Sequence, residues 1–352
     1  MIATIIGTRP EIIKMSRLIP LLDKNFDHTF IFTCQHYSEN MTDIFFSELK
    51  VRKPDKLLNA KTSNYSILIN LCKKTLEKIN PDYVLVYGDT NSTLAACVAA
   101  KILNKKVIHV EAGLRSFDPE MFEEVNRIVA DHLSQLLFTP TNYTKKLLEN
   151  ENIKENVFVV GNTVVDAVLF YKKYLNNSKI LKKLNIEPEN YALLTLHRAE
   201  TVDRPERFKS IIATIEKIDN KIVFPIHPRT KMRIEEFNIK LPTNIIPTSP
   251  LGYFDFLNLL KNSSYVLTDS GGVQEEAVTL KVPCITLRRF TERQETIEIG
   301  ANFLTGYEEE KILNCVREIK ETNLKKKLKK IKNPYGNGKA SLKIFKILSS
   351  IL

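Results

Sequence analysis

The sequence predicts an α/β protein built from two doubly wound, Rossmann-like domains that face one cleft. Short apolar runs alternate with longer amphipathic runs along the chain, a pattern typical of parallel sheets covered by helices. The alternation restarts after Asn162, and a glycine turn follows an apolar run in each half. At 352 residues the chain is long for one hydrophobic core and sufficient for two domains.

The first half predicts a sheet of buried strands. Apolar runs place these strands at Ile2–Ile6, Thr29–Thr33, Tyr83–Tyr87, Lys106–Val110 and Leu136–Phe138. Amphipathic runs predict helices at Ile12–Leu22, Met41–Leu49, Ser66–Ile79, Thr90–Leu103 and Glu123–Ser134. Pro10 suits the start of the first helix, because a residue in the first turn needs no N–H.

The second half repeats the pattern. Strands are expected at Tyr191–Thr195, Lys221–Pro225, Tyr265–Thr268 and Pro283–Thr286. Helices are expected at Tyr253–Lys261, Val273–Thr279 and Gln294–Ile299. The boundary between the halves falls near Gly161–Asp166, which predicts a first domain at 1–165 and a second that begins at 166.

Composition indicates an ordinary soluble protein, with 43% hydrophobic and 26% charged residues. No apolar run approaches the roughly 18–20 residues that span a bilayer, so we expect no membrane association. Met1–Ile6 already reads as a strand, which argues against an export signal. The five cysteines lack the spacing of metal ligands, so we expect reduced thiols, a cytoplasmic location and no metal site.

The net charge of +11 raises the question of nucleic-acid binding. Much of the excess comes from lysines on amphipathic runs, above all 325–332, where no aromatic side chains are interleaved. A solvated helix face explains this run better than a nucleic-acid site. We therefore expect no nucleic-acid partner, although the charge favours an anionic substrate.

The segment Thr268–Ala277 carries the clearest functional signal. A buried strand leads through Ser270, Gly271 and Gly272 into a helix, so backbone N–H groups and the positive helix end converge on one point. This arrangement is typical of an anion site, usually for diphosphate, and Glu276 lies within reach of a neighbouring sugar hydroxyl. An ordinary strand–helix turn that needs small residues is the alternative.

A second turn of this kind follows the first strand. Gly7–Glu11 leads into a helix that presents Arg9 and Lys14 near the C-terminal edge of the sheet. In open parallel sheets this edge is where ligands bind.

Carboxylates end or follow the next strands of the first half. Asp89 follows one strand, Glu111 ends the next, and Glu123 opens a helix. Because adjacent parallel strands deliver their C-terminal loops to one rim, these carboxylates could converge and serve in acid–base catalysis. A helix cap is the alternative for Asp89 and a helix-start charge the alternative for Glu123.

The second half contributes basic groups at strand ends. His197 and His227 each follow a predicted strand, and two histidines at matching positions favour function over structure. Arg293 lies in a loop after a strand, where a cation could stabilise a departing phosphate.

These segments together resemble the non-hydrolysing UDP-N-acetylglucosamine 2-epimerases, most closely the archaeal members. The resemblance runs from Gly7 to about Gly338. It rests on these segments, in this order: GTRPEIIK from Gly7, QHYSENM from Gln35, GDTNSTLAA from Gly88, HVEAGLRSFD from His109, EEVNRIVADH from Glu123, GNTVVDA from Gly161, LTLHRAE from Leu194, IHPRT from Ile226, TDSGGVQEEA from Thr268 and TERQETIEIG from Thr291.

The resemblance implies a fold and a reaction. The fold is that of GT-B glycosyltransferases, with a second domain at 166–335 and a last segment, 336–352, that crosses back to the first domain as a helix from Ala340 to Leu352. The reaction inverts carbon 2 of UDP-N-acetylglucosamine by elimination of UDP to a bound 2-acetamidoglucal and readdition of UDP. No cofactor is implied, and the partners are the UDP-sugar substrate and a second copy in a homodimer.

The resemblance also implies residue roles. Asp89, Glu111 and Glu123 match the acid–base carboxylates, and His197 matches the histidine that assists the leaving phosphate. The implied substrate contacts are Arg9 and Lys14 in the nucleotide-sugar site, Ser270, Gly271 and Gly272 at the diphosphate, Glu276 at the ribose, Phe256 beside uracil and Arg293 at the diphosphate. Gln35 and His36 match an allosteric site for a second substrate molecule.

The chain departs from the family beside some of these positions. Phe122 and Gln294 stand where prolines are common, and Arg289–Phe290 replaces a polar pair. The loop 62–66 differs from a family segment at the allosteric site, which makes activation by substrate a weaker expectation. Which carboxylate removes which proton is left open.

Three other functions are compatible with the same turns. A hydrolysing relative would release UDP and free N-acetylmannosamine, and a UDP-diacetamido-uronate 2-epimerase would act on a modified sugar. A GT-B glycosyltransferase, or a non-catalytic nucleotide-sugar binder, would keep the diphosphate turn without the three carboxylates at the opposite rim.

Overall fold

The computed structural model describes residues 1–35, 45–118 and 121–352. The chain divides into two compact units, each with its own parallel sheet. Unit 1 comprises Met1–Phe170 with Pro334–Leu352, and unit 2 comprises Tyr171–Asn333. The chain leaves unit 1 at the end of helix α8 (Thr163–Tyr171), past the residues expected for the boundary, because an apolar helix continues through them.

Unit 1 contains a 7-stranded parallel sheet in the order β3-β2-β1-β4-β5-β6-β7. Its strands are β1 (Ile2–Ile6), β2 (His28–Phe32), β3 (Lys56–Leu57), β4 (Tyr83–Tyr87), β5 (Lys106–Val110), β6 (Leu136–Thr139) and β7 (Val157–Val159). The strand order reverses between β1 and β4. Ligands of doubly wound sheets bind at the carboxyl ends of the strands beside such a reversal.

Unit 2 contains a 6-stranded parallel sheet in the order β10-β9-β8-β11-β12-β13. Its strands are β8 (Tyr191–Thr195), β9 (Lys221–Pro225), β10 (Ile245–Thr248), β11 (Val266–Thr268), β12 (Cys284–Thr286) and β13 (Asn302–Leu304). The order reverses between β8 and β11, so the turns after these two strands occupy the ligand-binding position of this sheet. The doubly wound α/β fold is therefore confirmed in both units.

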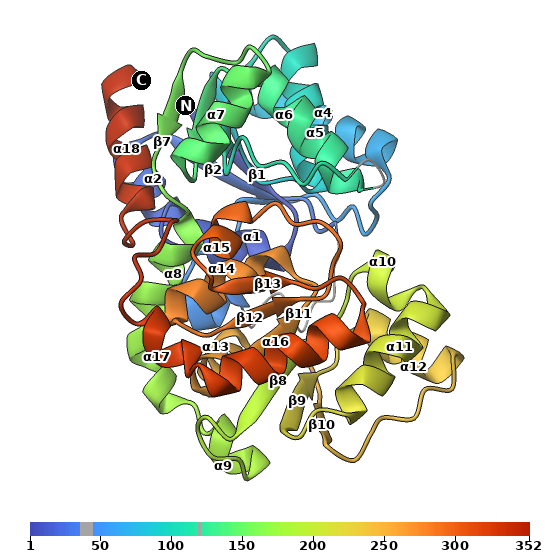
Figure 1. The fold of residues 1–352 in the computed structure, drawn as a ribbon. Coiled ribbons are helices and arrows are strands. Elements are labelled where there is room, and N and C mark those ends of the chain that lie inside the picture. The colour runs from blue at the N-terminus through green and yellow to red at the C-terminus, as the bar shows by residue number, and fades with distance from the viewer. Residues whose placement is uncertain (36–44, 119–120) are drawn as a thin grey trace. The chain divides into compact units, whose positions relative to one another are not determined.

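Helices cover both sheets (Figure 1). In unit 1 they are α1 (Arg9–Met15), α2 (Ile19–Asn25), α4 (Tyr65–Ile79), α5 (Asn91–Ile102), α6 (Phe122–Leu133), α7 (Asn142–Asn150), α8 and α18 (Ala340–Ile351). In unit 2 they are η1 (Lys172–Asn177), α9 (Ile180–Leu184), α10 (Ala199–Val202), α11 (Pro205–Glu216), α12 (Pro228–Glu236), α13 (Tyr253–Asn262), α14 (Gly271–Leu280), α15 (Gln294–Glu298), α16 (Glu309–Glu321) and α17 (Leu324–Leu328). The helix expected at Met41–Leu49 begins outside the described residues.

The single helix expected at Ile12–Leu22 is wrong, because the structure has α1 and α2 there. Pro20 lies in the first turn of α2. In a continuous helix its ring would clash with the carbonyl of Ser16, and its missing N–H would leave that carbonyl without a partner. The chain turns at 16–18 instead, and α2 starts afresh.

The core of each unit consists of the alternating strand residues and the inward faces of the helices. In unit 1 it includes Ile5, Val84 and Val86 with small residues of α5 such as Ala96. In unit 2 it includes Leu194, Leu267 and Phe224 with Ile312 and Val316 of α16. Strands buried on both faces carry continuous apolar runs, as observed here.

The returning segment, Pro334–Leu352, belongs to unit 1 and ends in α18. Figure 1 shows α18 (red) beside α2, where Phe345 makes an edge-to-face contact with Phe26 at 6.2 Å between ring centroids. The start of α18 is capped from α8, because Asp166 accepts hydrogen bonds from the backbone N–H groups of Ala340 (3.0 Å) and Ser341 (2.6 Å). A carboxylate at a helix N-terminus satisfies free N–H groups and complements the helix dipole.

Two further properties of the described residues bear on function. No helix among them is both long and apolar enough to cross a membrane. The five cysteines are free thiols, of which Cys34, Cys72, Cys97 and Cys284 are buried. Burial raises the pKa of Cys72 and of Cys284 to about 12 and that of Cys315 to about 11, and it also raises the pKa of Cys34 and Cys97.

Candidate functional site

Glu111, the residue that follows β5, lies at the centre of a buried polar cluster in unit 1. Lys14 Nζ lies 2.8 Å from both carboxylate oxygens of Glu111, and both side chains are nearly inaccessible to solvent. The Tyr87 hydroxyl and the Asn162 side-chain amide each donate to Oε2, also at 2.8 Å. An ammonium and two neutral donors stabilise the ionised carboxylate. The structure thus brings together Lys14 and Glu111, both expected from sequence.

The backbone at Glu111 is strained. Its φ of 70° is in the left-handed region, which costs a non-glycine residue on the order of 1 kcal/mol. Two residues on, Gly113 has φ of 80°, and a Cβ there would lie 2.5 Å from the Thr144 carbonyl oxygen. A glutamate held in this conformation within a buried ion pair indicates a functional role, since strain of this kind concentrates at active sites.

Asp89 lies on the turn after β4 and is half-exposed. Its carboxylate forms an ion pair with the buried guanidinium of Arg127, which also contacts Glu124. Asn126 donates to the Asp89 carbonyl oxygen at 2.9 Å. Helix α6 therefore fixes this turn through two consecutive side chains.

The two glutamates at the start of α6 differ in environment. Glu124 is buried and accepts hydrogen bonds from the backbone N–H groups of Ser116 and Phe117, so it holds the preceding loop. Glu123 is only partly buried. The Tyr65 hydroxyl donates to Asn126 at 2.9 Å. Burial raises the pKa of this hydroxyl, and the nearby charge of Glu123 raises it further. Glu123 is thus close to the helix side chain that holds the Asp89 turn.

A second buried layer supports the turns that carry Asp89 and Glu111. His109 Nδ1 lies 2.7 Å from Asp131 Oδ1, and its Nε2 lies 2.7 Å from the Gly88 carbonyl oxygen. Arg115 contacts the other oxygen of Asp131 at 2.7 Å. Burial alone would raise the pKa of Asp131, but the hydrogen bonds and charges of His109 and Arg115 lower it below its ordinary value.

Glu11 was not expected from sequence as a site residue. It accepts hydrogen bonds from the backbone N–H groups of Gly7 (3.1 Å) and Thr8 (2.8 Å), from the Thr8 hydroxyl (2.7 Å) and from the Thr90 hydroxyl (3.3 Å). It therefore joins the turn after β1 to the turn after β4. Burial raises the pKa of Glu11 to about 7, against the lowering effect of these hydrogen bonds, and the charge of Asp89 raises it further.

We expect Glu11 to make folding stability depend on pH. The Glu11 carboxylate binds a proton more tightly in the folded state than in the unfolded chain, where a glutamate pKa is about 4.3. The contribution of Glu11 to stability is therefore fully present below pH ~4.3 and is lost as the pH rises through about 7, by at most about 4 kcal/mol. Glu11→Gln should remove this part of the pH dependence, as measured by thermal unfolding between pH 4.5 and 8.

The exposed Glu155 provides a matched control. Glu155→Gln should leave the pH dependence of the melting temperature as in the wild type. A Glu11→Gln variant whose melting temperature follows the wild-type pH curve would show that Glu11 titrates alike in the folded and unfolded states.

The remaining site residues expected in unit 1 are Arg9, Gln35 and His36. Arg9 begins α1, its guanidinium lies 5.9 Å from the ring centroid of Phe45, and burial lowers its pKa. The side-chain Oε1 of Gln35 accepts from the backbone N–H (2.9 Å) and hydroxyl (2.8 Å) of Ser92, at the start of α5. His36 lies outside the described residues.

In unit 2, Asp269 joins the turns after β8 and β11. This fully buried carboxylate accepts from the backbone N–H groups of His197 and Arg198, each at 2.9 Å. His197 Nδ1 lies 3.4 Å from it, and the His197 ring lies 5.6 Å from that of His227. Burial lowers the pKa of His197, and the Asp269 charge opposes this shift. The two histidines expected at strand ends are thus brought together.

The turn Ser270–Gly272 leads into α14 as expected, although the helix starts at Gly271 rather than Val273. The two glycines have different surroundings. A Cβ at Gly271 would lie 2.3 Å from Glu292 Oε1, whereas a Cβ at Gly272 would meet no atom of the described residues within 4 Å. Gly272 therefore borders open space at the helix N-terminus, where an anion can approach the backbone.

Arg293 forms ion pairs with buried carboxylates next to this turn. Its Nε lies 2.6 Å from Oε1 of Glu275, and its Nη1 lies 3.8 Å from Glu292. Glu292 in turn pairs with Arg288 at 3.0 Å. These side chains are nearly inaccessible to solvent. The two arginines and two glutamates of this cluster balance in formal charge, and their ion pairs hold α15 against α14.

Glu276 and Phe256 lie on the neighbouring helices α14 and α13. Glu276 is buried and close to Tyr253, whose hydroxyl pKa is raised well above its ordinary value by burial and by the Glu276 carboxylate. Phe256 is partly buried. Tyr253 was not expected from sequence, because its hydroxyl meets Glu276 only through helix packing.

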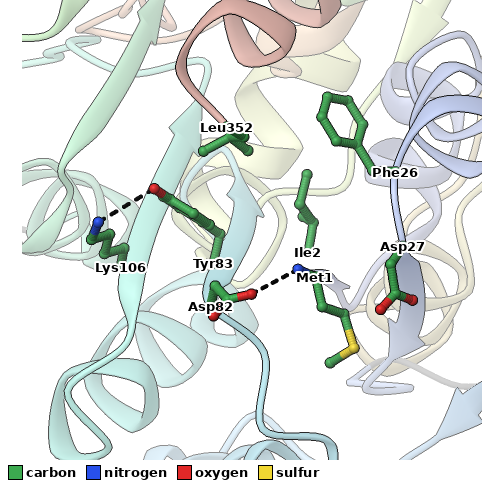
Figure 2. Close-up of a pocket in the computed structure, with 8 residues that line it drawn as sticks. All are labelled: Met1, Ile2, Phe26, Asp27, Asp82, Tyr83, Lys106 and Leu352. Carbon is green, nitrogen blue, oxygen red and sulfur yellow. Dashed lines mark hydrogen bonds and ion pairs between the residues drawn. The ribbon is translucent and has the colours of Figure 1, made fainter.

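A hollow of about 350 Å³ lies at the other edge of the unit 1 sheet, at the amino ends of β1, β4 and β5 (Figure 2). Its charged contacts are the Met1 amine with Asp82 at 2.7 Å and Lys106 with the Tyr83 hydroxyl at 3.4 Å. It is remote along the strands from the switch-point turns, and it contains none of the expected site residues. No group of three or more potential metal ligands gathers within the ranges 1–35, 45–118 and 121–352.

Comparison with known proteins identifies the family of the chain. The sequence profile of the family described as UDP-N-acetylglucosamine 2-epimerase matches residues 21–349. The UDP-N-acetylglucosamine 2-epimerase of Methanocaldococcus jannaschii is 50% identical, over 99% of this chain and 98% of the relative. The UDP-2,3-diacetamido-2,3-dideoxy-D-glucuronate 2-epimerase of Pseudomonas aeruginosa is 37% identical over 99% of both chains.

A solved structure shows the same fold over the whole chain. The crystal structure of the Methanocaldococcus jannaschii UDP-GlcNAc 2-epimerase in complex with UDP-GlcNAc and UDP superposes with a TM-score of 0.92. Its sequence is 47% identical, and the match covers 99% of both chains. With two GT-B-type Rossmann-like units and this extent of identity, the chain belongs to the UDP-N-acetylglucosamine 2-epimerase family.

Proposed function

We propose that the protein reversibly converts UDP-N-acetylglucosamine to UDP-N-acetylmannosamine without releasing free sugar. The observation that carries the proposal is the buried Lys14–Glu111 pair, an ionised carboxylate at the switch point of unit 1. It is supported by the open Gly272 turn at the switch point of unit 2. The relative that is 50% identical is named UDP-N-acetylglucosamine 2-epimerase, which fits the substrate and the epimerised carbon of the proposal.

The reaction needs a base and a stabilised leaving group. A carboxylate removes the C2 proton while the bond between C1 and the β-phosphate oxygen breaks, which leaves 2-acetamidoglucal and UDP. UDP then adds back to C1, and a proton returns to C2 from the opposite face. Asp89, Glu111 and Glu123 are the candidates for these proton transfers.

The candidate residues of unit 2 are assigned to binding of the nucleotide. In the proposal, Ser270, Gly271 and Gly272 bind the diphosphate through backbone N–H groups, and His197 stabilises charge on departing UDP. Glu276 accepts from the ribose, Phe256 contacts uracil and Arg293 acts at the diphosphate. Arg9 and Lys14 line the sugar side.

The product distinguishes this proposal from its alternatives. In D2O, the enzyme should convert UDP-N-acetylglucosamine to a mixture of both UDP sugars with deuterium at C2, as followed by anion exchange and mass spectrometry. Free UDP and free N-acetylmannosamine in equal amounts at early times would instead identify a hydrolysing enzyme.

A second candidate is a UDP-diacetamido-uronate 2-epimerase, because a relative of that name is 37% identical over the full chain. The identity of 50% to a UDP-N-acetylglucosamine 2-epimerase favours the first candidate. Parallel assays with the two UDP sugars decide between them, since the preferred substrate will show the higher kcat/KM.

The assembly and location in our proposal follow from family resemblance. We propose a cytoplasmic homodimer, which fits the five free thiols, and light scattering at micromolar concentration tests the mass. Activation by a second substrate molecule at Gln35 and His36 stays a prediction, and a sigmoidal dependence of rate on substrate would support it.

A further inference from the structure

Asn162 lies between Glu111 and the segment of chain that returns to unit 1. Its side-chain Nδ2 donates to Glu111 Oε2 at 2.8 Å. Its Oδ1 accepts from the backbone N–H of Val164 at 3.0 Å and lies 3.2 Å from the Tyr87 hydroxyl. Because the backbone N–H of Val164 donates to Oδ1, the amide has one satisfactory orientation, with its N–H groups toward Glu111.

The backbone of Asn162 is fixed by the returning segment. Its N–H donates to the Tyr335 carbonyl oxygen at 2.9 Å, one residue past the point where the chain re-enters unit 1. Gly161 makes this approach possible, since its φ is 97° and a Cβ would lie 2.8 Å from the same carbonyl oxygen. A larger residue at 161 would push the segment and the amide apart.

We propose that Asn162 is a positioning residue for Glu111 and ties the orientation of this carboxylate to the returning segment. The inference rests on the proposed function. Lys14 bonds to both oxygens and fixes no single rotamer, whereas the Asn162 amide and the Tyr87 hydroxyl both address Oε2. Two donors on one oxygen favour a single rotation of the carboxylate, and this rotation determines how Oε1 is presented.

The sharpest test is Asn162→Asp, which keeps the shape and the acceptor for Val164 but replaces the donor by a second carboxylate. We expect kcat to fall at least a hundredfold at pH 8, with KM changed less than threefold, because proton transfer is affected more than binding. Asn162→Ala should lower kcat about tenfold, as the donor is lost without added charge.

The pH profile separates positioning from a merely structural role. The titratable groups that face position 162 are Glu111, Lys14 of α1 and Tyr87 of β4, while Asp89 on the next turn is paired with Arg127. In Asn162→Asp a proton taken up at low pH restores a donor toward Glu111. The ratio of variant to wild-type kcat should therefore rise as the pH falls from 8 to 5.5.

Asp166→Asn is the matched control, because Asp166 also holds the returning segment but contacts Ala340 and Ser341 instead of Glu111. It should lower the melting temperature while leaving kcat within about twofold of wild type, because the bond between the Asn162 N–H and the Tyr335 carbonyl oxygen is retained. Wild-type kcat in both Asn162 variants, or a pH-independent ratio, would overturn the inference while leaving the epimerase intact. A wild-type enzyme without C2 exchange would overturn the proposed function and this inference together.

Discussion

Glu111→Gln is expected to lower turnover by about two to four powers of ten, the usual scale for a lost acid–base group. The amide cannot accept a proton, but it keeps the size of the glutamate and can still accept from Tyr87 and Asn162. The measurements are kcat for the UDP sugar and the rate of deuterium exchange at C2. Asp89→Asn tests the second carboxylate by the same two assays.

Stability must be measured alongside, since Glu111→Gln breaks the buried ion pair with Lys14. Breaking a buried pair costs about 3–5 kcal/mol, so a lower melting temperature is expected. Circular dichroism at the assay temperature shows whether the variant remains folded, and the exposed Glu155→Gln controls for the loss of one charge. A folded Glu111→Gln enzyme with near wild-type exchange would remove Glu111 from the mechanism.

Gly272→Ala is expected to weaken UDP binding at least tenfold while it stabilises the protein. The new methyl group would extend into open space at the N-terminus of α14, where the diphosphate is proposed to approach the backbone. Replacing a glycine by alanine within a helix stabilises by about 0.4–1 kcal/mol when no clash results. Calorimetric titration with UDP and thermal unfolding should thus change in opposite directions.

The neighbouring glycine supplies the comparison. Gly271→Ala places its Cβ against Glu292, which is buried between two arginines, so stability and UDP affinity should both fall. Gly271→Val should be worse, because valine adds two methyl groups to a Cβ that already has too little space. Unchanged UDP affinity in Gly272→Ala would show that the turn is only structural.

The sequence predicted the parts of the fold that local pattern determines. Buried strands such as β1 and β4 are continuous apolar runs, and the Ser270–Gly272 turn is visible in the residue types alone. The short exposed strand β3 has no such pattern, and it exists only because β2 offers a free edge. Pro20 was the available signal for two helices in place of one.

The contacts of the site depended on distant pairings that no local pattern specifies. Glu111 was identified by its place at a strand end, but Asn162 lies 51 residues away and meets it only in the folded unit. Glu11 had a local signal, since Thr8 and Glu11 are spaced as a capping box, yet its link to Thr90 did not follow from that spacing. Arg293 was expected at the diphosphate. Its ion pair with Glu275 depends on the packing of α14 and α15, which the sequence does not show.

The five thiols have a practical consequence for spectroscopy. Because burial raises the pKa of each, little thiolate exists at neutral pH, and alkylating dyes should react with the native cysteines slowly. Cysteines introduced at one exposed position of each unit would then capture nearly all of an added dye pair. Energy transfer between the two dyes could report in real time how the separation of the units responds to UDP, without first removing any native cysteine.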